Sequence, residues 1–205
     1  MTNIIILEDI LMVWNLPNKL TMIRIILIPV FIILLAFNWS DWGDLFVLGN
    51  LIPMNRVFAT IVFVVASLTD LADGKIARKR HLVTNFGKFA DTLADKMLVM
   101  TAFIFLVSFK MAPAWVVAII VCRELAVTGL RTIVLEEGGK VMAAQMPGKI
   151  KTTTQMVAII FLLMNNIFFS AINIPIGQIF LYICLIFTLY SGGDYFYQAR
   201  DIFKR

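Results

Sequence analysis

The chain has 205 residues, of which 60% are hydrophobic and only 15% charged, and its mean hydropathy is +0.90. A soluble domain carries about a quarter charged residues, so this composition excludes an ordinary water-soluble fold and indicates a polytopic membrane protein. The net charge of +5 is informative through its placement, because basic residues near the ends of membrane spans indicate orientation.

The apolar stretches predict an all-α integral membrane protein with six transmembrane helices, formed by the single domain 1–205. An apolar N-terminal segment, residues 1–13, is too short to cross a bilayer and is expected to be flexible or to lie at the interface. Trp14, Lys19 and Arg24 are typical interfacial anchors, and Pro17 is typical of a helix start. The spans are predicted, in chain order, at about 20–37, 56–71, 86–108, 113–135, 152–169 and 176–195.

The connection 38–55 carries acids, glycines and tryptophans but no basic residue, which is typical of a loop on the outer side. Of the 18 Lys and Arg residues, only Arg56 and Lys110 fall on that side. Both termini are therefore expected to face the cytoplasm, and a bacterial inner membrane is the expected location.

The most informative stretch runs from Asp70 to Asp95 at the junction of the second and third spans. It reads Asp-x-x-Asp-Gly-x-x-Ala-Arg, then eight residues, then Gly-x-x-x-Asp-x-x-x-Asp. On helices, this spacing places Asp70 and Asp73 on one face and Asp91 and Asp95 on one ridge. Two carboxylates are thus expected to face two others.

Four acids in a low-dielectric setting repel one another unless they bind protons or cations. Ligation by oxygen alone suits Mg²⁺, Mn²⁺ or Ca²⁺, and four carboxylates can serve two metals if one or two of them bridge. Basic residues around the acids, such as Lys75 and Arg78, indicate a ligand that carries phosphate. The lone His81 is expected to be solvated, and Cys122 and Cys184 lie in apolar stretches without a case for a disulfide or metal site.

The complete array resembles the signature of the CDP-alcohol phosphatidyltransferases, membrane enzymes of phospholipid synthesis. The resemblance implies a homodimer of six-helix protomers, a CDP-linked lipid donor (CDP-diacylglycerol) and two divalent cations, Mg²⁺ or Mn²⁺. By this resemblance, three of the aspartates bind each cation, and Asp95 also acts as the general base. The first cation would be held by Asp70, Asp73 and Asp91, and the second by Asp70, Asp91 and Asp95.

The resemblance also assigns residues to the CDP group. Gly74, Arg78 and Thr84 match positions used around it, and Gly87 lets a ligand or backbone approach closely. Asn18 and Thr21 are further candidates for binding CDP-diacylglycerol, with helix capping as the alternative.

The fourth span contains Arg123, Glu124 and Arg131, charges that must face a bundle interior or an aqueous cavity. A structural Glu–Arg pair is one explanation, and a basic wall that also includes Lys149 is the other. The segments RELAVTGLR and GKIKT resemble the subfamily that uses sn-glycerol 3-phosphate, so Arg123, Arg131 and Lys149 are expected to bind the acceptor phosphate.

Serine, inositol phosphate and phosphatidylglycerol remain alternative acceptors. A divalent-cation transporter would also explain the four acids, but it leaves the glycines and the arginines of the fourth span without a role. No nucleic-acid partner is expected.

Overall fold

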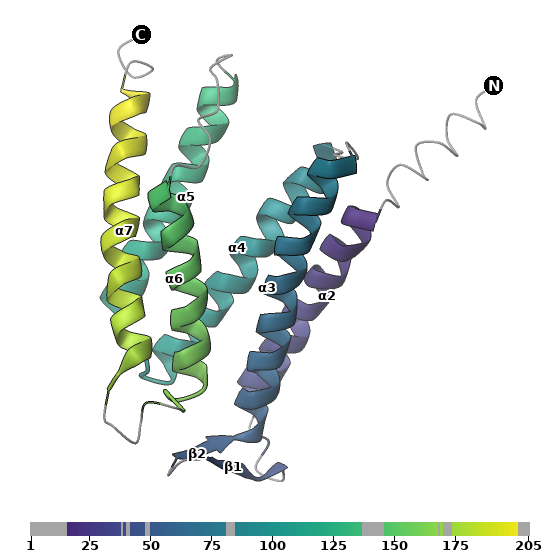
Figure 1. Ribbon diagram of the computed structural model, residues 1–205, viewed down its shortest axis with the longest axis vertical. Coiled ribbons are helices and arrows are strands. Elements are labelled where there is room, and N and C mark those ends of the chain that lie inside the picture. Colours follow the sequence, from purple (N-terminus) through teal and green to yellow (C-terminus); the bar gives the residue numbers. More distant parts are fainter. Residues whose placement is uncertain are drawn as a thin grey trace, which may run out of the picture. The chain divides into compact units, whose positions relative to one another are not determined.

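The computed structural model describes residues 16–37, 39, 42–47, 50–80, 85–136, 146–167, 169 and 174–200, without the side chains of 16–20, 70–80, 85–89, 91, 135–136 and 199. Six α-helices and one β-hairpin form these parts (Figure 1). They are α2 (Leu16–Ala36), β1 (Asp44–Val47), β2 (Asn50–Pro53), α3 (Met54–Arg80), α4 (Asn85–Ser108), α5 (Ala114–Glu136), α6 (Met146–Leu163) and α7 (Ile176–Ala199). The N-terminal segment predicted to lie at the interface falls outside the described residues.

Prolines mark most of the helix starts. Pro17 and Pro147 are the second residues of α2 and α6, and Pro53, Pro113 and Pro175 immediately precede α3, α5 and α7. Proline is favoured there because the first helical N–H groups have no partner within the helix. The remaining proline, Pro29, lies inside α2.

Two helices are followed by residues that have a positive φ but are not glycine. Lys110 follows α4 with φ 58°, and the Met111 N–H donates to the Leu106 carbonyl at 2.9 Å. Asn165 and Asn166 follow α6 with φ 52° and 53°. Such αL ends satisfy the last carbonyls of a helix.

Helices α3 and α6 differ most from the predicted spans, and α2 begins at Leu16, four residues before its predicted start. Helix α3 continues through Arg80, beyond the apolar span predicted to reach the motif near Leu71, so Asp70 and Asp73 lie on helical backbone as predicted. Helix α6 begins at Met146 and ends at Leu163, whereas the sequence predicted 152–169. Hydropathy placed these boundaries at changes from polar to apolar residues, but the backbone stays helical through the polar turns.

The outer loop contains a hairpin that was not predicted. Strands β1 and β2 pair with each other in a two-stranded sheet between α2 and α3 (Figure 1).

The chain forms two compact units: residues 1–47 with 51–102, and residues 48–50 with 103–205. In the first, α2 packs against α3. The Phe31 and Phe63 rings lie 6.1 Å apart between centroids, and the Asn55 Nδ2 donates to the Leu34 carbonyl at 3.1 Å. These contacts show that α2 and α3 run antiparallel.

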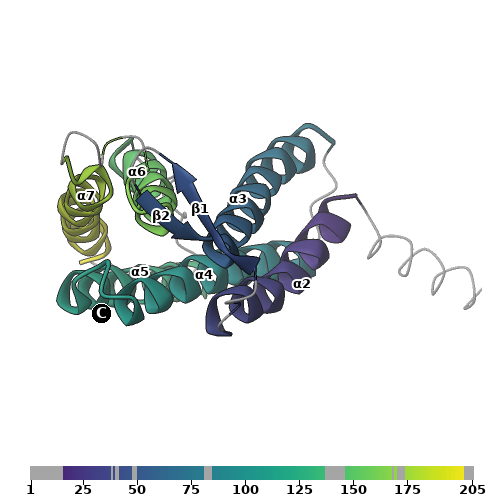
Figure 2. The same ribbon diagram turned by 90° about the horizontal axis from the view of Figure 1, so that it is seen from below.

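In the second unit, helix α7 packs against both α6 and α5. Helices α6 and α7 run side by side and antiparallel (Figures 1 and 2), and a Cβ at Gly177 would lie 2.8 Å from Leu162 Cγ, so glycine permits their close approach. The Asn166 Oδ1 accepts a hydrogen bond from the Gly177 N–H at 2.7 Å at the start of α7. Along α5, Trp115 and Arg123 meet Tyr182 and Ser191 of α7 in the same order, so these two helices are parallel.

Among the described residues, the segment Ile176–Gln198 of α7 is long and apolar enough to cross a membrane, and two shorter apolar segments occur at Thr21–Ala36 and Met54–Thr69. The structure is thus largely helical with one clear apolar span, and the other five predicted spans stay a prediction.

Candidate active site

The two halves of the acidic motif lie on successive helices of the first unit. Asp70 and Asp73 belong to the last part of α3, and Asp91 and Asp95 to the first part of α4. Helical backbone at both places supports the predicted spacing of each pair along one face. The side chains of Asp70, Asp73 and Asp91 fall outside the described residues, so their convergence stays a prediction.

The donor-binding candidates are described to different extents. Gly74 and Arg78 lie in α3, Gly87 in α4 and Asn18 in α2, in each case without a described side chain, and Thr84 falls outside the described residues. The described side chains contain no group of three His, Cys, Asp or Glu residues that could hold a metal ion, and three of the four predicted ligands lie outside these side chains. The donor set itself, four carboxylates at helical spacing, fits a hard divalent cation.

A buried polar pair lies on the face of α2 that packs against α3. Thr21 and Arg24 are 4% and 1% exposed and continue the buried stripe of α2. Burial corrects the expectation that Arg24 is an interfacial anchor. The start of α2 at Leu16, five residues before Thr21, removes the capping explanation for Thr21.

The position of Arg24 along α2 links it to the acidic motif. Arg24 precedes Phe31 by seven residues, and Asp70 follows Phe63 by seven. Because the two helices are antiparallel, Arg24 lies toward the end of α3 that carries Asp70. The first unit therefore holds a buried cation in the half of α2 nearer the acidic motif.

In the second unit, two arginines of α5 reach α7. The Arg123 Nη2 donates to the Ser191 Oγ at 2.6 Å, and an Arg131 Nη2 donates to the Tyr195 hydroxyl. The guanidinium carbons lie 5.9 Å (Arg123) and 4.7 Å (Arg131) from the centroid of the Tyr195 ring. One aromatic ring thus holds two positive charges in place through cation–π and hydrogen-bond contacts.

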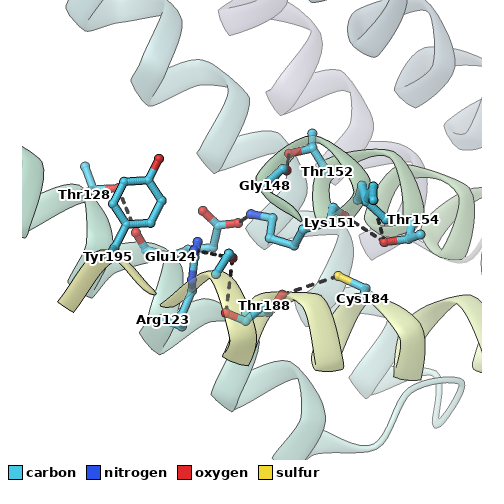
Figure 3. Close-up of polar contacts among 12 residues, drawn as sticks. Arg123, Glu124, Thr128, Gly148, Lys151, Thr152, Thr154, Cys184, Thr188 and Tyr195 are labelled. Atoms are coloured by element: carbon cyan, nitrogen blue, oxygen red, sulfur yellow. Dashed lines mark hydrogen bonds and ion pairs between the residues drawn. The ribbon is translucent and has the colours of Figure 1, made fainter. Parts of the chain in front are cut away.

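The acid next to Arg123 is neutralised from another helix. The Lys151 Nζ of α6 forms an ion pair with Glu124 Oε1, and Lys151 is only 6% exposed (Figure 3). The alternative of a structural Glu–Arg pair is therefore not found in the described parts of the chain. With Glu124 paired to a lysine, neither Arg123 nor Arg131 has a carboxylate partner among the described residues.

Glycine at 192 allows Arg123 to lie against α7. A Cβ built on Gly192 would lie 3.0 Å from Arg123 Cγ and 3.1 Å from its Nε. A Cβ added at the adjacent Gly193 would have no atom of another residue within 4 Å. The arginine stem therefore occupies the space that a side chain at 192 would fill.

The third predicted acceptor residue is placed differently. Lys149 is exposed on α6, two residues from Lys151 and therefore on the opposite side of the helix. The structure brings Arg123 and Arg131 together around Tyr195, and among the described residues Lys149 makes no side-chain contact with either arginine, so its role stays a prediction. Sequence reasoning missed Tyr195 and Gly192, although the glycine pair in SGGDY, within an otherwise apolar predicted span, could have indicated close helix packing there.

The sequence matches the CDP-alcohol phosphatidyltransferase family model over residues 14–190, most of the chain. The chain belongs to this family.

Curated relatives of this CDP-alcohol phosphatidyltransferase match over nearly its whole length. A Bacillus subtilis protein named CDP-diacylglycerol--glycerol-3-phosphate 3-phosphatidyltransferase is 50% identical over 191 residues, which cover 93% of this chain and 98% of that one. A Rickettsia typhi protein of the same name is 36% identical over 92% of this chain and 99% of its own. A Mycobacterium tuberculosis protein named probable phosphatidylglycerophosphate synthase is 35% identical over 92% and 83%. The family comprises membrane enzymes that use divalent cations.

Proposed function

We propose that the chain transfers the phosphatidyl group of CDP-diacylglycerol to sn-glycerol 3-phosphate, giving phosphatidylglycerol phosphate and CMP. The observation that carries this proposal is the pair Arg123 and Arg131, both held at Tyr195 while Lys151 neutralises the neighbouring Glu124. Two guanidinium groups without a carboxylate partner in the described structure suit a phosphate dianion, which Arg can contact in bidentate fashion. The names of the relatives agree with this substrate pair.

The remaining acceptor contact would come from Lys149. Lys149 is exposed on α6, so its ammonium group would reach the acceptor phosphate from the solvent side, whereas Arg123 would reach it from beside Tyr195. A phosphorylated acceptor bound there would be fixed by its phosphate, which leaves its hydroxyl group available for reaction.

The donor would be bound by the acidic motif. Gly74, Arg78, Thr84 and Gly87 would hold the CDP group, together with Asn18 and the buried Thr21 of α2. Asp70, Asp73 and Asp91 would hold one divalent cation, and Asp70, Asp91 and Asp95 the other, with Mg²⁺ or Mn²⁺ as the expected ions. When bound, these ions supply positive charge that offsets the pyrophosphate charge.

In the reaction, Asp95 would accept the proton of the acceptor hydroxyl group. The hydroxyl oxygen forms a bond to the phosphorus next to diacylglycerol, and the bond from that phosphorus to the bridging oxygen breaks. CMP leaves with that oxygen. Asp95 suits this role because it is partly exposed on α4 and can exchange its proton with water.

The site would lie at the cytoplasmic side of a bacterial inner membrane. In this proposal the chain forms one domain, 1–205, that crosses the membrane six times with both termini in the cytoplasm. Two such chains form a homodimer. The apolar segment Ile176–Gln198 of α7 and the basic residues of the chain support this placement.

Release of CMP from CDP-diacylglycerol tests the proposal. The wild-type protein with Mg²⁺ and glycerol 3-phosphate should release CMP, and Asp95→Asn should abolish release while leaving the thermal midpoint of unfolding close to that of the wild type. Serine, inositol phosphate and phosphatidylglycerol are supplied in parallel, and a preference for one of them would assign another acceptor. Wild-type protein that releases no CMP with any acceptor would refute the transferase assignment.

A further inference from the structure

The β1–β2 hairpin has a buried face and an exposed apolar face. Two residues separate the strands, so Phe46 lies opposite Leu51, and Leu45 lies opposite Ile52 on the other face. Ile52 is fully buried, whereas Phe46 and Leu51 are 68% and 60% exposed. One face packs on the protein and the other presents a large hydrophobic pair outward.

An aromatic cluster joins the hairpin to α3. The Trp39 and Trp42 rings lie 4.5 Å apart between centroids, and Trp42 meets Phe58 edge-on at 5.5 Å. The Met54 N–H donates to the Gly43 carbonyl at 3.2 Å, and Gly43 has the positive φ of 69° that this turn requires. The exposed pair is therefore fixed to the end of an apolar helix by the ring contacts and this hydrogen bond.

The exposed hydrophobic surface continues from the hairpin onto the helices. Phe37 at the end of α2 and Phe58 and Ile61 near the start of α3 are also exposed. A two-stranded hairpin is marginally stable in water, and an apolar exposed strand pair promotes association. Tryptophan at the ends of apolar helices is typical of the membrane–water interface, where its ring contacts both media.

We propose that the face carrying Phe46 and Leu51 lies on the lipid surface at the outer side of the membrane and fixes the depth of α2 and α3. This rests on the membrane placement proposed above. Lipid is the occupant because the pair is continuous with the exposed apolar residues of α2 and α3, which face lipid if these helices cross the bilayer. Of the described charged residues near the hairpin, Asp44 and Arg56 interact electrostatically with each other.

Nitroxide labels at Phe46→Cys and, separately, Leu51→Cys test the proposal in liposomes. The background carries Cys122→Ser and Cys184→Ala, because Cys122 is exposed and would also be labelled. Exposed Lys110→Cys, at the α4–α5 turn, serves as the control in water. Collisions with oxygen, which concentrates in lipid, are compared with collisions with a water-soluble nickel complex.

The ratio of oxygen to nickel collisions should be several-fold higher at positions 46 and 51 than at 110. Equal ratios at all three positions would overturn the proposal, because the hairpin would then lie in water. Spin–spin broadening that vanishes when labelled protein is diluted with unlabelled protein would instead assign the face to a second copy of the chain, and would also overturn it. CMP release by the labelled proteins is measured separately, so a failure of the proposed catalysis leaves the collision result interpretable.

Discussion

Replacing Gly192 with alanine should weaken acceptor binding without unfolding the protein. The new Cβ would lie 3.0 Å from Arg123 Cγ, whereas carbon atoms in contact prefer about 3.5–4.0 Å. Since Cγ is near the base of the side chain, moving it displaces the guanidinium group that donates to Ser191 at 2.6 Å.

The expected effect follows from the contact that the displaced guanidinium group would make with the acceptor phosphate. Losing a hydrogen bond to a charged group removes about 1.5–3 kcal/mol of binding free energy, and about 1.4 kcal/mol corresponds to a factor of ten in affinity. Because Arg123 can rotate part of the way back, we expect the lower end of this range. The KM for glycerol 3-phosphate should rise about tenfold, while the KM for CDP-diacylglycerol stays unchanged.

Gly193→Ala is the matched control. It makes the same substitution one residue further along α7, where no atom lies within 4 Å of the new Cβ. Alanine in a helix is more stable than glycine by about 0.5–1 kcal/mol, so this variant should unfold at a higher temperature with wild-type kinetics. Steady-state CMP release and thermal unfolding are measured for both variants. A KM for glycerol 3-phosphate equal to that of the wild type in Gly192→Ala, or the same rise of this KM in Gly193→Ala, would refute the reasoning.

Two further predictions concern the contacts around the arginines. Lys151→Met leaves the partly buried Glu124 carboxylate without its partner, which costs at most about 3 kcal/mol, so the temperature of thermal unfolding should fall. Adding Glu124→Gln should recover most of this fall, and an additive second loss would contradict the ion pair. Tyr195→Phe keeps the ring but removes the hydroxyl that accepts from Arg131, so the KM for glycerol 3-phosphate should rise about three- to tenfold. Tyr195→Leu, which also removes the cation–π contact, should raise that KM further, and equal kinetics for the two variants would exclude a role for the ring.

The helix starts could be predicted because they depend on local chemistry. Pro113 and Pro175 precede α5 and α7, and both helices begin within one residue of the predicted spans. The start of α6 was wrong by six residues, because the turn around Lys149 is polar yet helical. Hydropathy reports where a chain prefers lipid, whereas helix formation requires only satisfied backbone hydrogen bonds.

The spacing of Asp70, Asp73, Asp91 and Asp95 identified the family from the sequence alone, because the family's motif depends on which residues recur at helical spacing along the chain. The partners of the charges in α5 were decided only by the tertiary structure. Glu124 has arginines near it in sequence, but its ion pair is formed with Lys151 from a different helix. The two arginines instead contact the ring of Tyr195 on α7. Such contacts depend on how three helices pack and rotate against one another, and the order of residues along a single helix does not contain that information.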